Sequence, residues 1–554
     1  EVIKYLSSLS FNTLYSVYYL SFSSIESIRD THSFLLFIHS LTKCSLFVLS
    51  ISLFKMASTT HTVVKRLLES SSEFPIKLHN FIDNEFESTP DKMESINPST
   101  GKLFFYLNRS TKTEADRAVC AAKKAFESWS QTSPQYRSSI LLKAAQIIED
   151  NLDDIALLES KDQGKPVWLA KAVDIPRCVH NLRYFANAIL HHTDPSILHH
   201  SPTPGLSYVV RDPVGVAVLI SPWNLPIYLL SFKIAPAIAT GNTVVCKPSE
   251  LTSATAYILM HALYEAGLPK GVVNMVLGTG AEVGEALVTN PDVGLVSFTG
   301  STVIGKRIAT VVAPFNKKTS LEMGGKNACI VCPSTQLDKV IPDIVRSCFI
   351  NQGEVCLCTS RLFVHQSIYH TFLEEFLLEA KKYDVGDPES GSKLGAMNSK
   401  LHFDKVMSYI SLSKDEGGQI LLGGKSVQPD GRCHGGYFIE PTVIVGLGDH
   451  SRCMKEEIFG PVVCISPFET NQEVIDRTNS TPYGLSATVF SNNVNEIHSI
   501  ARSLRVGTVW CNTWMLRDLN MPFGGTKDSG MGREGGEDSL HFFTEQKTIC
   551  IKLI

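Results

Sequence analysis

Two cysteines stand one residue apart in the stretch INQGEVCLCTSR, which covers residues 350–361. Cys356 and Cys358 could form a metal clip, act as a redox pair, provide one nucleophile beside a bystander, or pack as two inert thiols. A zinc site needs further Cys or His ligands at fixed spacing, and the surrounding sequence does not supply them. The sequence therefore predicts no metal site here, and it leaves the other three interpretations open.

Two glycine-rich stretches imitate nucleotide-binding motifs. LGTGAEVG at 277–284 misses the dinucleotide fingerprint by one residue, so this match alone is weak. GSTVIGKR at 300–307 resembles a phosphate-binding loop, but Arg307 stands where Ser or Thr would meet magnesium. The second stretch therefore does not predict a nucleotide triphosphatase.

The elements that must position such residues form two α/β patterns. Helical periodicity is evident at 114–129 and 138–162. Apolar, β-branched runs then alternate with helices such as 254–267. The runs are VAVLIS (216–221), TVVCK (243–247), VNMV (273–276) and LVSF (295–298). This rhythm predicts a doubly wound α/β domain whose ligand binds at the carboxyl ends of parallel strands. A second α/β pattern begins near Asn327 and ends around 522–530.

Composition limits the class of protein. The 554 residues carry a formal net charge of −4 without long runs of like charge, so a dedicated nucleic-acid surface is not expected. Fourteen cysteines are scattered without regular spacing, which favours reduced thiols in the cytosol over a disulfide framework.

The first 55 residues differ from the rest. They are rich in Ser and Tyr, and their clean apolar run at 45–54 is too short to cross a bilayer. We expect translated upstream sequence or an unstructured extension before Met56, and a membrane anchor through 33–54 is the alternative. The whole extension is expected to cover residues 1–73.

A set of ordered motifs resembles the aldehyde dehydrogenase superfamily and spans most of residues 74–554. The motifs are SPWNLP (221–226), KPSE (247–250), FTGS (298–301), LEMGGKN (321–327), NQGEVC (351–356), EEIFGP (456–461) and MPFGGTKDSGMGRE (521–534). One such motif would be modest support, whereas all of them in this order are very specific.

The resemblance assigns the chemistry. It implies that Cys356 is the nucleophile, with Cys358 a packed neighbour, and that a thioester forms on Cys356. Asn224 would donate to the oxyanion together with the backbone N–H of Cys356; the alternative is that Asn224 only caps the following helix. Glu322 would be the general base, and a solvated surface glutamate is its alternative.

The resemblance also implies an NAD site. Lys247 and Glu250 would hold the adenosine ribose, where a carboxylate favours NAD over NADP. Ser301 would meet the pyrophosphate at a helix N-terminus. Glu457 and Phe459 would position the nicotinamide ribose and ring. Two more expected cofactor-binding residues are Trp223 and Gly278.

The implied fold is α/β, with a Rossmann-like NAD-binding domain, an α/β catalytic domain and a small β-hairpin oligomerisation element. We expect the NAD-binding domain at 74–190 and 213–323 and the catalytic domain at 324–530. Residues 191–212 and 541–554 would form the oligomerisation element of a homodimer or homotetramer.

Two arginines distinguish one branch of the superfamily. Arg177 in DIPR and Arg517 in RDLNMPFGG stand where superfamily members commonly carry apolar side chains in the substrate funnel. Since buried guanidinium groups need an anion, they predict a substrate with a carboxylate. The stretches resemble the 2-aminomuconic and 2-hydroxymuconic semialdehyde dehydrogenases of tryptophan (kynurenine) and aromatic degradation, a branch also associated with retinal oxidation.

Several alternatives stay open from sequence. Arg177 could pair with Asp174, and Arg517 with Asp518, which would remove the carboxylate argument. The substrate could be retinal or a general aliphatic aldehyde. The chain could also be a non-catalytic homologue with a structural or binding role, although the intact set of Cys356, Glu322 and Asn224 argues against that.

Overall fold

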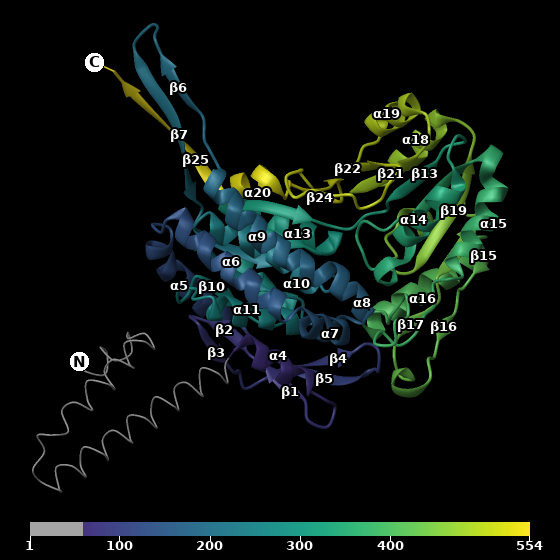
Figure 1. Cartoon of the computed structure of the whole chain (residues 1–554), viewed down its shortest axis with the longest axis horizontal. Coiled ribbons are helices and arrows are strands. Elements are labelled where there is room, and N and C mark those ends of the chain that lie inside the picture. Colours follow the sequence, from purple (N-terminus) through teal and green to yellow (C-terminus); the bar gives the residue numbers. More distant parts are fainter. Residues whose placement is uncertain (1–58, 554) are drawn as a thin grey trace, which may run out of the picture. The chain divides into compact units, whose positions relative to one another are not determined.

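The computed structural model describes residues 59–553, and from Val63 onward the chain forms one compact unit (Figure 1). The predicted extension before Met56 and its alternative anchor lie outside the described residues. Within the described part, no helix is long and apolar enough to cross a membrane.

The first sheet has eight strands, and its central five are parallel. Their order is β24 (Gly530–Met531), β12 (Lys318–Glu322), β11 (Val293–Thr299), β8 (Val216–Ile220), β9 (Thr243–Lys247), β10 (Val273–Met275), β2 (Asn80–Ile82) and β3 (Glu85–Glu87). Ile220 lies opposite Lys247, and Thr299 opposite Glu322. The carboxyl ends of four strands are therefore level, as the doubly wound pattern predicted.

Helices cover both faces of this sheet because successive strand residues are apolar on both sides. One face packs against α10 (Pro226–Ala239) and α11 (Ala254–Glu265), with α6 (Pro134–Asp150), α7 (Leu152–Gln163) and α9 (Ile175–His191) packed around them. The other face packs against α5 (Lys112–Trp129), α12 (Glu285–Thr289) and α13 (Thr302–Val312).

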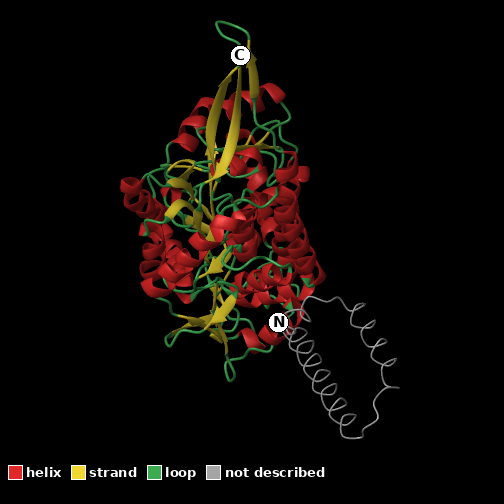
Figure 2. Cartoon of the chain, turned by 90° about the vertical axis from the view of Figure 1, so that its left-hand side faces the viewer, coloured by secondary structure: helices red, strands yellow, loops and turns green. Residues whose placement is uncertain are grey.

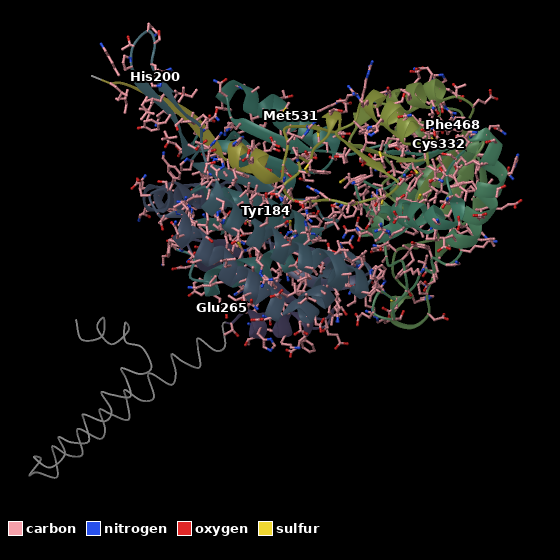
Figure 3. All side chains as sticks on the ribbon, turned by 45° about the horizontal axis from the view of Figure 1, so that its top comes forward. Tyr184, His200, Glu265, Cys332, Phe468 and Met531 are labelled. Carbon is pink, nitrogen blue, oxygen red and sulfur yellow. The ribbon has the colours of Figure 1, made fainter. Side chains whose placement is uncertain are left out.

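The second sheet has seven strands. The segment 350–360, which contains Cys356 and precedes β14, is called the nucleophile loop after the role expected for that cysteine. The strand order of this sheet is β15 (Gln419–Leu422), β18 (Thr442–Val445), β19 (Val462–Phe468), β14 (Arg361–His365), β13 (Ala328–Val331), β21 (Ser486–Phe490) and β22 (Thr508–Cys511). The surrounding helices are α14 (Leu337–Phe349), α15 (Tyr369–Ala380), α16 (Lys400–Asp415), α18 (Asn471–Asn479) and α19 (Val494–Ser503). Figure 3 labels Cys332 and Phe468 in this part of the chain.

A separate three-stranded sheet projects from the helices around the first sheet (Figure 2). It joins β6 (Ser196–His199), β7 (Gly205–Pro213) and β25 (Thr544–Lys552), and β25 pairs with β7 along its full length. The inserted hairpin and the terminal strand thus meet, although they are far apart in sequence. A smaller sheet combines β1 (Ile76–Leu78), β5 (Lys102–Asn108) and β4 (Lys92–Asn97).

Two boundaries differ from the sequence-based expectation. Residues within the expected extension 1–73 form helix α4 (Thr60–Leu68), because Val64 and Leu67 are apolar on one face and pack into the core. The single helix expected at 138–162 is two helices, α6 and α7, which break at Asn151, where φ is −114°.

Candidate active site

Cys356 lies on a loop after α14 and the short 3-10 turn η5 (Ile350–Gly353). In that turn, Asn351 and Gln352 have φ values of 53° and 55°, a region that most side chains avoid. The side chain of Asn327 donates a hydrogen bond of 2.6 Å to the carbonyl of Cys356. The turn before Cys356 thus has an unusual backbone conformation, and Asn327, from the loop between β12 and β13, anchors the carbonyl of Cys356 itself.

The two cysteines have different surroundings. Cys356 is half-buried, and burial together with the Glu322 and Glu457 carboxylates raises the pKa of its thiol. The guanidinium of Arg517 opposes that shift. Cys358 is buried, and burial raises its pKa to about 12, so it stays a protonated thiol. The pKa values of both thiols are thus raised, and the cysteines differ in exposure: Cys356 is half-buried beside the two carboxylates, whereas Cys358 is packed in an apolar cluster.

Asn224 lies on the loop between β8 and α10 and faces the nucleophile loop. Its Nδ2 donates to the carbonyl of Glu354 at 2.8 Å, two residues before Cys356. An amide nitrogen carries two hydrogens, so a second N–H is available to a ligand. Helix α10 begins after Leu225 with no side-chain hydrogen bond at its cap. The alternative helix-capping role of Asn224 therefore has no support here.

Glu322 ends strand β12 and is buried, not solvated. Its Oε1 atom has no hydrogen-bond partner. Burial and the Glu534 carboxylate raise the pKa of Glu322 well above its usual range, while Lys233 and Arg517 oppose the shift. A buried carboxyl with a raised pKa and a free oxygen has the properties of a general base.

The sequence had not singled out Lys233 and Glu534, which sit beside Glu322. Lys233 Nζ pairs with Glu534 Oε1 at 2.7 Å and contacts Ser297 Oγ at 2.9 Å. The sequence could have pointed to Lys233, because it is the single charged residue of the mainly apolar helix α10. This ion pair sets the electrostatic environment of the Glu322 carboxyl.

A cavity of about 380 Å³ adjoins the nucleophile loop. Its wall includes Arg177, His180, Tyr228, Val355, Trp514 and Arg517. The structure thus brings together the two arginines singled out from sequence, one on α9 and one on the loop after β22.

Neither arginine pairs with the neighbouring aspartate that the alternative interpretation required, Asp174 for Arg177 and Asp518 for Arg517. Nε and Nη2 of Arg177 and of Arg517 are buried without hydrogen-bond partners. Asp174 instead pairs with Lys165, and Asp518 accepts hydrogen bonds from Asn520.

Aromatic rings support both guanidinium groups. Arg177 lies 5.4 Å from the ring centroid of Tyr228, and Arg517 lies 3.8 Å from that of Phe523. The Tyr228 hydroxyl is also 3.5 Å from Nη1 of Arg517. Tyr228 therefore contacts both arginines, and the sequence had not identified it.

The expected cofactor residues lie along the level edge of the first sheet. Lys247 ends β9 and pairs with Glu250 at 3.0 Å. Ser301 is the N-cap of α13, where its side chain accepts from the backbone N–H of Ile304. Free N–H groups at such a helix start bind anions.

Four more expected cofactor residues come from both sheets: Glu457 and Phe459 precede β19 of the second sheet, whereas Trp223 and Gly278 follow β8 and β10 of the first. Glu457 Oε1 accepts from the backbone N–H of Gly325 at 2.9 Å. The rings of Trp223 and Phe459 meet edge to face at 5.4 Å, with His402 beside both. Gly278 packs so closely that an added Cβ would lie 2.4 Å from Val283 Cγ2, so its small size serves packing.

Comparison with known proteins identifies the family. The model of the aldehyde dehydrogenase family matches residues 86–549. The chain belongs to the aldehyde dehydrogenase family. It is 52% identical over 481 residues to 2-aminomuconic semialdehyde dehydrogenase from Bos taurus, covering 86% of this chain and 98% of that protein.

The chain is also similar in sequence and in structure to other aldehyde dehydrogenases. 2-Hydroxymuconic semialdehyde dehydrogenase from Pseudomonas sp. (strain CF600) is 39% identical over 86% of this chain and all of its own length. The NAD+ complex of an aldehyde dehydrogenase from Bacillus cereus superposes with a TM-score of 0.83 and 36% identity, covering 86% of this chain and 97% of that chain.

This aldehyde dehydrogenase is an oxidoreductase that oxidises aldehydes with NAD. Its own residues fit the cofactor. A carboxylate at Glu250 suits ribose hydroxyls, and an uncovered helix start at Ser301 suits a pyrophosphate. A Cβ on Gly324 would lie 2.2 Å from Glu457 Oε2, so this glycine lets the Glu457 carboxylate approach the backbone beside the nucleophile loop.

Proposed function

We propose that this chain oxidises a carboxylate-bearing semialdehyde to a dicarboxylate, and that the substrate is 2-aminomuconate semialdehyde, in tryptophan degradation. The carrying observation is the pair of buried guanidinium groups, Arg177 and Arg517, without an anionic partner at the cavity. Desolvated arginines are costly unless an anion compensates, and a carboxylate fits their fork of donors. The similarity to 2-aminomuconic semialdehyde dehydrogenases supports the same substrate.

The chemistry begins at Cys356. Glu322, whose raised pKa favours proton uptake, removes the thiol proton, and the thiolate attacks the aldehyde carbon. The second N–H of Asn224 Nδ2 and the backbone N–H of Cys356 stabilise the resulting oxyanion. NAD, when bound by these residues, would supply the hydride acceptor, and loss of the hydride from this carbon would leave a thioester on Cys356.

Hydrolysis then releases the acid. Glu322 first releases the thiol proton to solvent; it then takes a proton from water, and the hydroxide attacks the thioester carbonyl. The Cys356 sulfur leaves as thiolate and takes the proton back from Glu322, so the enzyme is restored and the product carries a second carboxylate. Arg177 and Arg517 hold the first carboxylate throughout and so orient the aldehyde toward the sulfur.

The other expected cofactor residues have separate roles. Lys247 and Glu250 would hold the adenosine ribose, and the Glu250 carboxylate would disfavour the 2′-phosphate of NADP. Trp223, Phe459 and Glu457 would bound the nicotinamide end.

Two further properties belong to the proposal. The hairpin sheet of β6, β7 and β25 presents Ile197 and Leu198 with 60% and 55% of their surfaces exposed, which supports its use in a homodimer or homotetramer. Thirteen cysteines in the described part of the chain are free thiols, which supports a reducing compartment, the cytosol.

The experiment is NADH formation with a panel of muconic semialdehydes, retinal and betaine aldehyde. We expect the highest kcat/KM with a muconic semialdehyde, because a long apolar aldehyde leaves both arginines without an anion. Cys356→Ser should abolish NADH formation, while Cys358→Ser, the matched control, should retain it. Activity that survives in Cys356→Ser would contradict the mechanism, and a clear preference for retinal would contradict the substrate.

A further inference from the structure

A buried segment that the mechanism does not use connects the parts of the site. We define residues 163–165 as the brace segment; it begins at the last residue of α7, and both Gln163 and Lys165 are fully buried. Gly164 has a φ of 101°, and an added Cβ would lie 2.6 Å from the carbonyl oxygen of Ala396. Only glycine adopts this turn without strain, so the brace segment has one fixed conformation.

Lys165 reaches two elements of the site from this segment. Its Nζ donates to Asp174 Oδ1 at 2.7 Å and to the carbonyl oxygen of Asn224 at 3.0 Å. Asp174 ends the π-helical turn η2 (Ala170–Asp174), directly before α9, which carries Arg177. One ammonium group therefore joins the oxyanion donor to the helix that holds the carboxylate-binding arginine.

Gln163 reaches the nucleophile loop. Its Nε2 donates to Glu354 Oε2 at 2.8 Å, and its Oε1 accepts from the backbone N–H of Lys165 at 2.9 Å. The carbonyl of Glu354 in turn accepts from Asn224 Nδ2. The hydrogen bonds thus form a closed circuit from Lys165 through Asn224 and Glu354 to Gln163.

Stability alone does not account for the Lys165–Asp174 pair. Both side chains are completely buried, and desolvation of such a pair offsets much of its attraction. Well-packed apolar residues of similar volume commonly give equal or better stability. An apolar side chain could not donate to the carbonyl of Asn224, which Lys165 contacts at 3.0 Å and the neutral amide of Asn351 at 3.3 Å.

We infer that Lys165 is a positioning residue for catalysis, which fixes the Asn224 loop against the nucleophile loop so that Asn224 Nδ2 is aimed at the oxyanion. This inference rests on the proposed role of Asn224. Loss of Lys165 leaves Asn224 present but misaligned, and a displacement of about 1 Å can lower a catalytic rate by roughly 100-fold.

The test is a double-mutant cycle on the single-turnover rate of NADH formation. Lys165→Met alone should lower that rate about 10- to 100-fold. In an Asn224→Ala background, where the donor is already absent, Lys165→Met should cost less than about twofold. If the two losses multiply instead, Lys165 acts independently of Asn224 and the inference is wrong. If Asn224→Ala itself leaves the rate unchanged, the proposed oxyanion role fails first.

Two further variants test whether a loss of rate reflects misfolding and not misalignment of Asn224. Lys165→Met leaves the Asp174 carboxylate unpaired, so Lys165→Met with Asp174→Asn removes the pair without a buried charge. This double variant should bind NAD with unchanged affinity in a fluorescence titration and should still lose single-turnover rate. Lys317→Met removes another buried lysine, one that contacts the carbonyls of Val288 and Asn290. It should show no coupling to Asn224→Ala, and equal coupling there would overturn the inference.

Discussion

The guanidinium of Arg517 lies 3.8 Å from the ring centroid of Phe523, with its Nε and Nη2 atoms buried and unpartnered. The ring orients the side chain without neutralising its charge. A buried charge that is held in place but not paired is suited to a ligand of opposite charge.

Removal of this guanidinium should affect carboxylate-bearing substrates selectively. Hydrogen bonds to a charged group contribute about 1.5–3 kcal/mol, so Arg517→Ala should raise KM for a muconic semialdehyde roughly 10- to 100-fold. KM for a neutral aldehyde should change far less. Steady-state kinetics with both substrates measures the difference, and equal effects would refute the carboxylate-binding role.

Arg346 provides a matched control for that experiment. It also lines the cavity, but Asp343 already pairs with it at 2.6 Å and Trp514 lies beneath it. Arg346→Ala should therefore leave the ratio of the two KM values close to that of the unaltered enzyme. A selective loss equal to that of Arg517→Ala would mean that any cavity arginine suffices.

The pH dependence of turnover should report Glu322. Burial and Glu534 raise the pKa of this carboxyl, so below that pKa it is protonated and cannot act as a base. We expect kcat to be low in acid and to rise with pH through the raised pKa. Glu534→Gln removes the neighbouring carboxylate and should shift the rise to lower pH. A profile unaffected by Glu534→Gln would indicate that another group titrates.

Alkylation should separate the two cysteines. Arg517 opposes the raised pKa of Cys356, so Arg517→Ala should slow the reaction of Cys356 with iodoacetamide at neutral pH. Cys358 is buried in an apolar cluster, so the reagent cannot reach it and it should remain unmodified in both proteins. Peptide mass spectrometry after timed labelling measures both sites. Faster labelling of Cys358 than Cys356 would reverse the assignment.

Cofactor choice should depend on Glu250. If its carboxylate repels a 2′-phosphate, Glu250→Ala should lower the KM for NADP and raise the KM for NAD. The partner Lys247 then becomes available to a phosphate, since Glu250 no longer occupies it. Kinetics with both cofactors at a fixed aldehyde concentration tests this. Unchanged discrimination would place cofactor choice elsewhere.

The strands that position the site could be predicted because their sequences are strongly patterned. TVVCK at 243–247 coincides with β9, and VAVLIS at 216–221 differs from β8 by one residue. Buried parallel strands are continuous apolar runs, which are easy to recognise. The break at Asn151 escaped prediction because helical periodicity continues on both sides of it.

The contacts around the reactive groups could not be predicted in the same way. Lys233 and Glu534 are 301 residues apart, and only the folded chain pairs them. The absence of a partner for Arg177 is also a tertiary property, because Asp174 stands three residues away in sequence but pairs with Lys165. Motifs pointed to Cys356, Glu322 and Asn224 as candidate catalytic residues, whereas their electrostatic surroundings required the structure.

The most direct measurement of the central claim is intact-protein and peptide mass spectrometry of Glu322→Gln after reaction with NAD and 2-aminomuconate semialdehyde. Without Glu322, solvent must take the thiol proton, so the thioester forms more slowly, but no base activates water and the thioester is not hydrolysed. We predict one equivalent of NADH and an acyl adduct on the peptide that contains Cys356. NADH formation with Cys356 unmodified, or an adduct on Cys358, would contradict the account.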